Sequence, residues 1–141
     1  MAKVAAICIS EVRGIQKHEI PEAFLRADYG IEGDAHAGNW HRQVSLLSVE
    51  TLQKKIDFEL KHGAFAENIL VEGMAVHKLP VGTKLRIGEA ECEVTQIGKE
   101  CHSDCAIRKA AGDCVMPREG IFVKVITSGK VKTGDEIEII E

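Results

Sequence analysis

The fold class of this sequence is decided by the stretch Pro80-Val-Gly-Thr-Lys-Leu-Arg-Ile-Gly-Glu-Ala-Glu-Cys-Glu-Val-Thr-Gln-Ile-Gly98. Apolar and polar residues alternate on both sides of Gly88, a pattern typical of two antiparallel strands joined by a glycine-containing turn. A period of two places the apolar side chains on one face of a sheet and the polar ones on the other. We therefore predict a hairpin with one face toward solvent.

Strand patterns recur on both sides of this hairpin. The apolar run Lys3–Ser10 is rich in Val and Ile and predicts a strand that is buried on both faces. Apolar runs at Gln43–Ser48 and Ala64–Val71 predict two more strands. Toward the C-terminus, Gly120–Ile126 and Asp135–Ile140 repeat the pattern with glycine-containing turns between them.

One segment has the pattern of a helix. Ser48 is a suitable N-cap for a helix from Val49 to about Leu60, in which Leu52, Ile56 and Leu60 share one face. Many short strands with few helices predict a mixed, mainly β fold built as a barrel or a strongly curved sheet. No linker or repeat divides the chain, so we expect a single domain over residues 1–141.

Composition excludes several classes of function. A chain of 141 residues is long enough to bury a core without disulfides or a structural metal. The formal net charge of -4 comes from intermixed acidic and basic residues, which argues against a nucleic-acid partner. No segment approaches the roughly 18 apolar residues of a membrane span, and no signal-type core follows the N-terminus. We expect a cytoplasmic protein with no membrane partner.

The five cysteines divide into two groups. Cys8 and Cys92 fall within apolar alternation and are expected to be inert core thiols. The other three, Cys101, Cys105 and Cys114, gather in one segment, Gly98–Gly120, which we call the cysteine segment. Clustered cysteines in a reducing compartment more often bind metal or react than form structural disulfides.

Three interpretations of this cysteine segment remain open from the residues alone. The first is a structural zinc site made by Cys101, His102, Cys105 and Cys114, although its ligands lack the usual two separated pairs. In the second, the cysteines are small, partly buried hydrophobic residues. The third is a reactive thiol that binds sulfur or a soft metal such as molybdenum. A short helix over residues 104–111 would place Cys105 in its first turn, where the helix dipole favours the thiolate.

Two further segments bring polar groups together. Gly30-Ile-Glu-Gly-Asp-Ala-His-Ala-Gly38 has three glycines in nine residues and places Asp34, His36 and His41 near one another. This pattern suits either a flexible loop or a loop whose backbone approaches a ligand closely. Glu67 and Asn68 interrupt an apolar run, so they need hydrogen bonds to backbone, water or a ligand if they are buried.

Together these segments resemble a small stand-alone MOSC domain, similar to the C-terminal part of molybdenum cofactor sulfurases. The resemblance extends in order over nearly the whole chain. The matching stretches are Gly30–Gly38, His41-Arg-Gln-Val-Ser-Leu-Leu47, Gly63-Ala-Phe-Ala-Glu-Asn-Ile69, Pro80-Val-Gly-Thr, Ile87-Gly-Glu-Ala, Glu93-Val-Thr-Gln96, Cys101–Cys105 and Gly112-Asp-Cys-Val-Met-Pro-Arg-Glu-Gly-Ile-Phe122.

The resemblance implies a MOSC-type β-barrel that handles the molybdenum cofactor, molybdopterin with its metal. In the family a cysteine is proposed to carry sulfur as a persulfide or to ligate molybdenum, and some members reduce N-hydroxylated compounds. Cys105 best matches that cysteine and is our candidate for the catalytic residue and the metal ligand. Cys114 and Cys101 are the other candidate catalytic thiols.

The same resemblance suggests which groups would contact the cofactor. A phosphorylated pterin presents an anion for cationic side chains and a ring edge for amides, and histidine titrates near neutral pH and can relay protons. Fixing a loop by hydrogen bonds is the alternative role for each group. The candidate cofactor-binding residues are His36, His41, Arg42, Gln43, Glu67, Asn68, Lys99 and Arg118.

The sequence departs from the large sulfurases in one respect. Its 141 residues leave no room for an aminotransferase-like domain and we find no lysine motif for pyridoxal phosphate, so we expect neither that domain nor a pyridoxal phosphate site. A cysteine desulfurase or reductase is therefore an expected partner, besides the cofactor or another small molecule. A non-catalytic carrier that passes cofactor or sulfur between enzymes is the alternative function, and a zinc-stabilised module is a third.

Overall fold

The computed structural model describes residues 2–12, 17–35, 37–40, 43–49, 67–97 and 120–140. Within these ranges the chain is almost entirely β-structure, with one short 3-10 helix, η1. The elements are β1 Ala2–Ile9, β2 His18–Ile20, β3 Glu22–Arg26, β4 Gly30–Ile31, β5 Val44–Ser48, β6 Ile69–Glu72, η1 Val76–Lys78, β7 Lys84–Ile87, β8 Ala90–Ile97, β9 Ile121–Thr127, β10 Gly129–Lys132 and β11 Glu136–Ile140.

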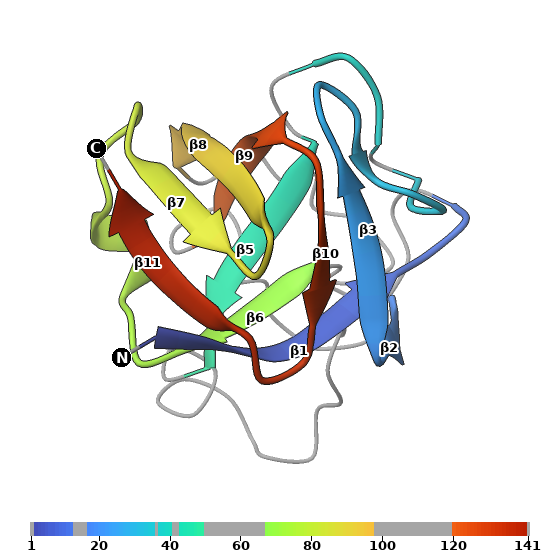
Figure 1. The fold of residues 1–141 in the computed structure, drawn as a ribbon, viewed down its shortest axis with the longest axis horizontal. Coiled ribbons are helices and arrows are strands. Elements are labelled where there is room, and N and C mark those ends of the chain that lie inside the picture. The colour runs from blue at the N-terminus through green and yellow to red at the C-terminus, as the bar shows by residue number, and fades with distance from the viewer. Residues whose placement is uncertain are drawn as a thin grey trace, which may run out of the picture.

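Seven strands close into a barrel (Figure 1). Their order is β11-β7-β8-β9-β5-β6-β1, and β1 pairs with β11 through Ala2 opposite Ile137 and Lys3 opposite Glu136. Neighbouring strands are antiparallel except for the parallel pair β5 and β6. Closure leaves no unpaired edge in the barrel itself. The predicted mainly β, barrel-type fold class is confirmed.

Two smaller parts are attached to the barrel. Strand β2 pairs with the second half of β1 and so extends the sheet outside the closed ring. Strands β10, β3 and β4 form a separate three-stranded antiparallel sheet. No helix among the described residues has the length and apolar character that crossing a membrane requires.

The predicted hairpin forms the β7–β8 pair. Ile87 lies opposite Ala90, so Gly88 and Glu89 make a two-residue turn in which Gly88 has a φ of 57°. Leu85 and Ile87 on β7 are fully buried, whereas their neighbours Lys84 and Arg86 are exposed. This alternation places the apolar side chains inside the barrel and the charged ones in solvent, as the period of two predicts.

The other predicted strands are also present where the structure describes them. Lys3–Ser10, Gln43–Ser48, Gly120–Ile126 and Asp135–Ile140 correspond to β1, β5, β9 and β11. Of the strand predicted at Ala64–Val71, the part from Ile69 lies in β6, Glu67 and Asn68 precede β6, and residues 64–66 lie outside the described residues. The helix predicted from Val49 to about Leu60 lies outside the described residues apart from Val49. Strands β2, β3, β4 and β10 were not predicted.

One side of the barrel is buried on both faces of its sheet. Ile7, Leu46, Ile69 and Ile121 belong to the core inside the barrel. The residues that alternate with them are also buried, yet do not belong to that core; they are Ala6 and Cys8 on β1, Leu47 on β5, Leu70 on β6 and Phe122 on β9. The outer face of these four strands is therefore part of the protein interior, as predicted for Lys3–Ser10.

The first prediction concerns the close approach of β10 to the β7–β8 turn. A Cβ atom on Gly129 would lie 2.6 Å from the amide nitrogen of Ala90 and nearer still to the carbonyl of Glu89. We expect Gly129→Ala to lower the free energy of unfolding by about 3 kcal/mol, because backbone atoms rather than flexible side chains must move. Urea unfolding followed by circular dichroism measures this loss.

Gly134→Ala is the matched control. A Cβ atom there meets nothing within 4 Å, and only the positive φ of 96° is strained. We expect a loss of about 1 kcal/mol for that strain. A loss at Gly129 no larger than the loss at Gly134 would contradict the close packing.

Candidate functional site

A buried amide joins three strands of the barrel on its outer face. Asn68 immediately precedes β6 and is fully buried. Its Oδ1 accepts two hydrogen bonds from Ser45, one from the backbone N–H at 2.9 Å and one from the side-chain hydroxyl at 3.2 Å. Its Nδ2 donates to the carbonyl of Cys8 at 3.1 Å. Asn68 therefore fixes β6 against both β5 and β1.

A second buried amide holds the start of β5. The Oε1 of Gln43 accepts a hydrogen bond from the backbone N–H of Val125 on β9 at 2.9 Å. Its Nε2 donates to Oδ1 of Asp28 at 3.4 Å, and Oδ2 of Asp28 accepts from the side-chain amide of Asn39. Gln43 thus connects the barrel to the turn before β4 and to the glycine-rich loop.

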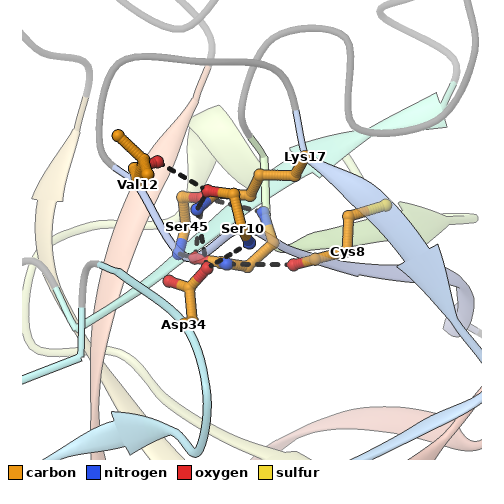
Figure 2. A network of polar contacts seen from close by, with 7 residues as sticks. Cys8, Ser10, Val12, Lys17, Asp34 and Ser45 are labelled. Atoms are coloured by element: carbon orange, nitrogen blue, oxygen red, sulfur yellow. Dashed lines mark hydrogen bonds and ion pairs between the residues drawn. The ribbon is translucent and has the colours of Figure 1, made fainter.

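A buried ion pair lies at the end of β1 (Figure 2). The Nζ of Lys17 is 2.7 Å from Oδ1 of Asp34, and neither side chain has exposed surface. The same carboxylate oxygen accepts a hydrogen bond from the backbone N–H of Ser10 at 3.1 Å. Lys17 also donates to the hydroxyl of Ser10 at 3.3 Å. This network is continuous with the Asn68 cluster through β1, because Cys8 and Ser10 are two residues apart.

These contacts anchor the loop from Gly30 to Gln43 at several points. A Cβ atom on Gly30 would lie 2.8 Å from the carbonyl oxygen of Gln43, so the two ends of the loop are nearly in contact. In the middle, Asp34 is held by Lys17, and the N–H of Ala35 donates to the carbonyl of Ser10 at 2.8 Å. Compact loops with adjoining ends often serve in binding.

The two described cysteines are buried, as predicted for core thiols. Burial, reinforced by the negative charges of Glu67 and Glu19, raises the pKa of Cys8 to about 12. Lys17 opposes this shift. Burial and Glu91 likewise raise the pKa of Cys92 to about 12. Both thiols are kept protonated, and this is the unreactive form.

The cysteine segment joins the barrel at the adjacent ends of β8 and β9. Strand β8 ends at Ile97 and β9 begins at Ile121, and these two residues are paired. Continued pairing leads from Ile121 to Leu46 on β5 and from Leu46 to Ile69 on β6. The segment therefore begins and ends in a row of paired residues, Ile97–Ile121–Leu46–Ile69, that runs across four strands. The last of these residues, Ile69, directly follows Asn68.

The predicted site residues fall into two sets. Gln43, Glu67 and Asn68 are described and are fully buried. The remaining ones lie outside the described residues; they are Cys101, Cys105, Cys114, His36, His41, Arg42, Lys99 and Arg118. His102, the fourth ligand of the zinc interpretation, lies outside them too. Among the residues that the structure describes, no group of three His, Cys, Asp or Glu side chains is arranged to hold a metal.

Sequence reasoning missed Lys17, Ser10 and Ser45. A lysine within the polar stretch after β1 has the pattern of a solvent-exposed residue, since lysine is almost never fully buried without a partner. Its partner Asp34 is 17 residues away. The only available signal was the combination of this lysine with an aspartate in a glycine-rich loop, which does not by itself indicate burial.

The fold is a closed β-barrel with a small additional sheet. The polar cluster around Asn68 lies on the outer face of strands β1, β5 and β6. The family model that matches this chain is the MOSC domain, over residues 33–138. The chain belongs to the MOSC family, as its resemblance predicted. No curated protein sequence matches the chain.

Solved structures share the fold over the whole chain. The YiiM protein of Geobacillus stearothermophilus superimposes with a TM-score of 0.75 and 17% identity, covering 100% of this chain and 76% of that one. The YuaD protein of Bacillus subtilis gives 0.73 and 22%, covering 98% and 94%. Escherichia coli YiiM gives 0.68 and 19%, covering 99% and 70%. At these identities the likeness establishes the fold alone.

The second prediction tests the structural role of Asn68. We expect Asn68→Ala to lower the free energy of unfolding by about 3 kcal/mol, because it leaves the buried Ser45 N–H and Cys8 carbonyl without these partners. Ser45→Ala is the control. It loses the hydroxyl, which donates to Oδ1 of Asn68 and accepts from the Asn68 N–H, but it keeps the bond from the Ser45 N–H to Asn68 and the bond from the Asn68 N–H to the Ser45 carbonyl. We expect a loss of about 1 kcal/mol. Equal losses in urea unfolding would contradict the bridging role.

The third prediction concerns thiol reactivity. With a pKa of about 12, only about one Cys8 or Cys92 thiol in ten thousand is ionised at pH 8. We expect both to resist iodoacetamide in the native protein and to react fully in guanidinium chloride. Peptide mass spectrometry measures the labelling of all five cysteines. Native labelling of Cys8 or Cys92 at the denatured rate would refute their burial.

Proposed function

We propose that this MOSC protein binds the molybdenum cofactor or its precursor in the cytoplasm, and that Cys105 carries sulfur as a persulfide or ligates molybdenum. The observation that carries the proposal is the MOSC match over residues 33–138, which includes the glycine-rich loop from Gly33 onward and the whole cysteine segment. Cys8 and Cys92 are unsuited to thiolate chemistry, which leaves it to Cys101, Cys105 and Cys114.

The residues present fit such a cofactor in their donor chemistry. Thiolate sulfur suits a soft metal centre, and Arg42, Arg118 and Lys99 supply the cationic groups that a phosphate requires. When bound, the cofactor would supply a redox-active molybdenum centre or accept a sulfur atom. His36 and His41 are assigned to hydrogen bonding or proton relay.

Gln43 and Asn68 contribute in two ways in this proposal. Each amide nitrogen donates one hydrogen bond to the protein and carries a second N–H. The hydrogen bonds that these amides donate to Asp28 and to the Cys8 carbonyl fix the backbone that supports the ligand. The second N–H groups are assigned to the acceptors on the pterin edge, and the buried Glu67 is assigned to the same wall.

The charge of Glu67 favours placing the cofactor's phosphate away from Glu67 and Asn68. Glu67 acts on the Cys8 thiol with a negative charge, which raises the pKa of Cys8. An anion placed there would meet the same repulsion. We therefore assign the phosphate to the side of Arg42, Lys99 and Arg118, and the uncharged ring to the side of Glu67 and Asn68.

The fourth prediction is a native mass measurement on protein purified from cells that make the cofactor. We expect added mass from a sulfur atom or from a molybdenum-containing pterin, and at least a tenfold lower loaded fraction in Cys105→Ser. Cys101→Ser and Cys114→Ser are the matched controls and should keep most of the load. An unchanged load in Cys105→Ser would refute the assignment of Cys105, and stoichiometric zinc would replace the proposal with a zinc-stabilised module.

The loaded protein also separates an enzyme from a carrier. With a chemical reductant, consumption of an N-hydroxylated compound would show reductase activity. Bound cofactor or persulfide without any consumption would indicate a carrier, which depends on a cysteine desulfurase or reductase partner. Transfer of labelled sulfur from a desulfurase to Cys105 would then identify that partner.

A further inference from the structure

The Lys17–Asp34 pair is unusual because both charges are removed from solvent. The two side chains have no exposed surface and their charged atoms are 2.7 Å apart. The exposed ion pair between Lys130 and Glu22 differs in both respects, since its atoms are 3.3 Å apart and each side chain is 47% exposed. The two pairs allow a direct comparison of a buried and an exposed ion pair in one protein.

A buried ion pair is a poor way to gain stability. Removing two charges from water costs about as much as their attraction returns, and apolar residues of similar size often serve equally well. What the pair does provide is a specific geometry, because each charge needs its partner at a defined position. The Lys17–Asp34 pair therefore points to a constraint on structure rather than to a gain in stability.

The constraint acts on the glycine-rich loop. Asp34 lies in the middle of the loop, whereas Ser10 and Lys17 lie at the end of β1 and just before β2. The carboxylate accepts hydrogen bonds from the Ser10 N–H and from Lys17, and Ala35 adds a backbone bond to the Ser10 carbonyl. Three bonds thus fasten the middle of the loop to the barrel.

The other described contacts of the loop lie nearer its ends, where the N–H of Gly38 donates to the carbonyl of Tyr29 and the side-chain amide of Asn39 donates to Asp28. Gly33 and Gly38 have φ values of 90° and 152°, so the backbone on both sides of Asp34 adopts conformations that glycine tolerates best. Among the described residues of the loop, Ile31 at its start is the one that belongs to the hydrophobic core. Without the ion pair, the middle of the loop would therefore have many more conformations available to it.

We propose that Lys17 and Asp34 form a positioning pair that holds the Gly30–Gln43 loop in the arrangement required for ligand binding. Lys17 is a positioning residue in this inference and does not contact the ligand. The part that concerns the ligand rests on the proposed function. The part that concerns the loop does not, and it can be tested without any ligand.

The fifth prediction uses the double variant Lys17→Met/Asp34→Leu, which removes both charges and leaves neither one unpaired. Amide hydrogen exchange, read by mass spectrometry, compares a loop peptide over residues 31–40 with a barrel peptide over residues 84–97. We expect exchange in the loop peptide to become at least tenfold faster, with exchange in the barrel peptide changed less than twofold. Glu22→Leu/Lys130→Met makes the matching replacements at the exposed pair and should change neither peptide.

The cofactor or persulfide load, measured as above, gives the second readout. We expect it to fall at least tenfold in Lys17→Met/Asp34→Leu and to be unchanged in the control pair. If the wild-type protein carries no load, the proposed function fails, while hydrogen exchange still decides the role of the pair. If the load persists although the loop exchanges faster, the positioning role in ligand binding is refuted.

Asp34→Asn serves as a second variant if the double variant does not fold. It retains an oxygen to accept from the Ser10 N–H but removes the charge that pairs with Lys17. The same selective acceleration of the loop peptide is expected. Unchanged loop exchange, or equal acceleration of loop and barrel peptides, would overturn the inference for either variant, because a purely structural pair would affect both regions together.

Discussion

The backbone pairing of β1 is the constraint on which the rest of the structure depends. Its first residues pair with β11 and close the barrel, its middle pairs with β6, and its last residues pair with β2. The register shifts between Val4 and Ala6, which changes the alternation of the side chains along the strand. After this irregularity, Ile7 points into the core while Cys8 is buried on the opposite face. One strand thus links barrel closure to the polar site.

Burial on both faces explains why Asn68 is hydrogen-bonded to both neighbouring strands. The outer face of β1, β5 and β6 is part of the interior, so Ser45 and Asn68 cannot rely on water as surface residues do. A buried polar group without a partner is costly, whereas a satisfied network specifies one arrangement of the strands. The amide of Asn68 meets this requirement by bonding across two strand neighbours at once, which fixes the position of the β6 N-terminus.

The sequence predicted what depends on local pattern. The alternation around Gly88 predicted β7, β8 and their turn, and the apolar runs predicted β1, β5, β9 and β11. Burial of Asn68 implied that it needs hydrogen-bond partners, but the partners are 23 and 60 residues away, and no local pattern specifies them. The same applies to Lys17, whose burial depends on a distant aspartate. Short strands such as β2 and β10 form through pairing with other strands rather than through strong intrinsic pattern.

The paired strands of the barrel and the loop from Gly30 to Gln43 are held in different ways, and this difference suggests how the fold supports a site. Asn68 and Ser45 lie on paired strands, where the backbone ladder fixes them. In the described part of the loop from Gly30 to Gln43, β4 is the only strand. The buried side chains of Gln43 at its end and Asp34 in its middle add to the backbone hydrogen bonds that hold it. The cysteine segment begins and ends at the paired residues Ile97 and Ile121, so the barrel also fixes where that segment starts and finishes. Precise sites need residues that rigid elements hold in place. In this chain the barrel is the rigid element. The loop is attached to it by two buried polar networks, one around Gln43 and one around the Lys17–Asp34 pair.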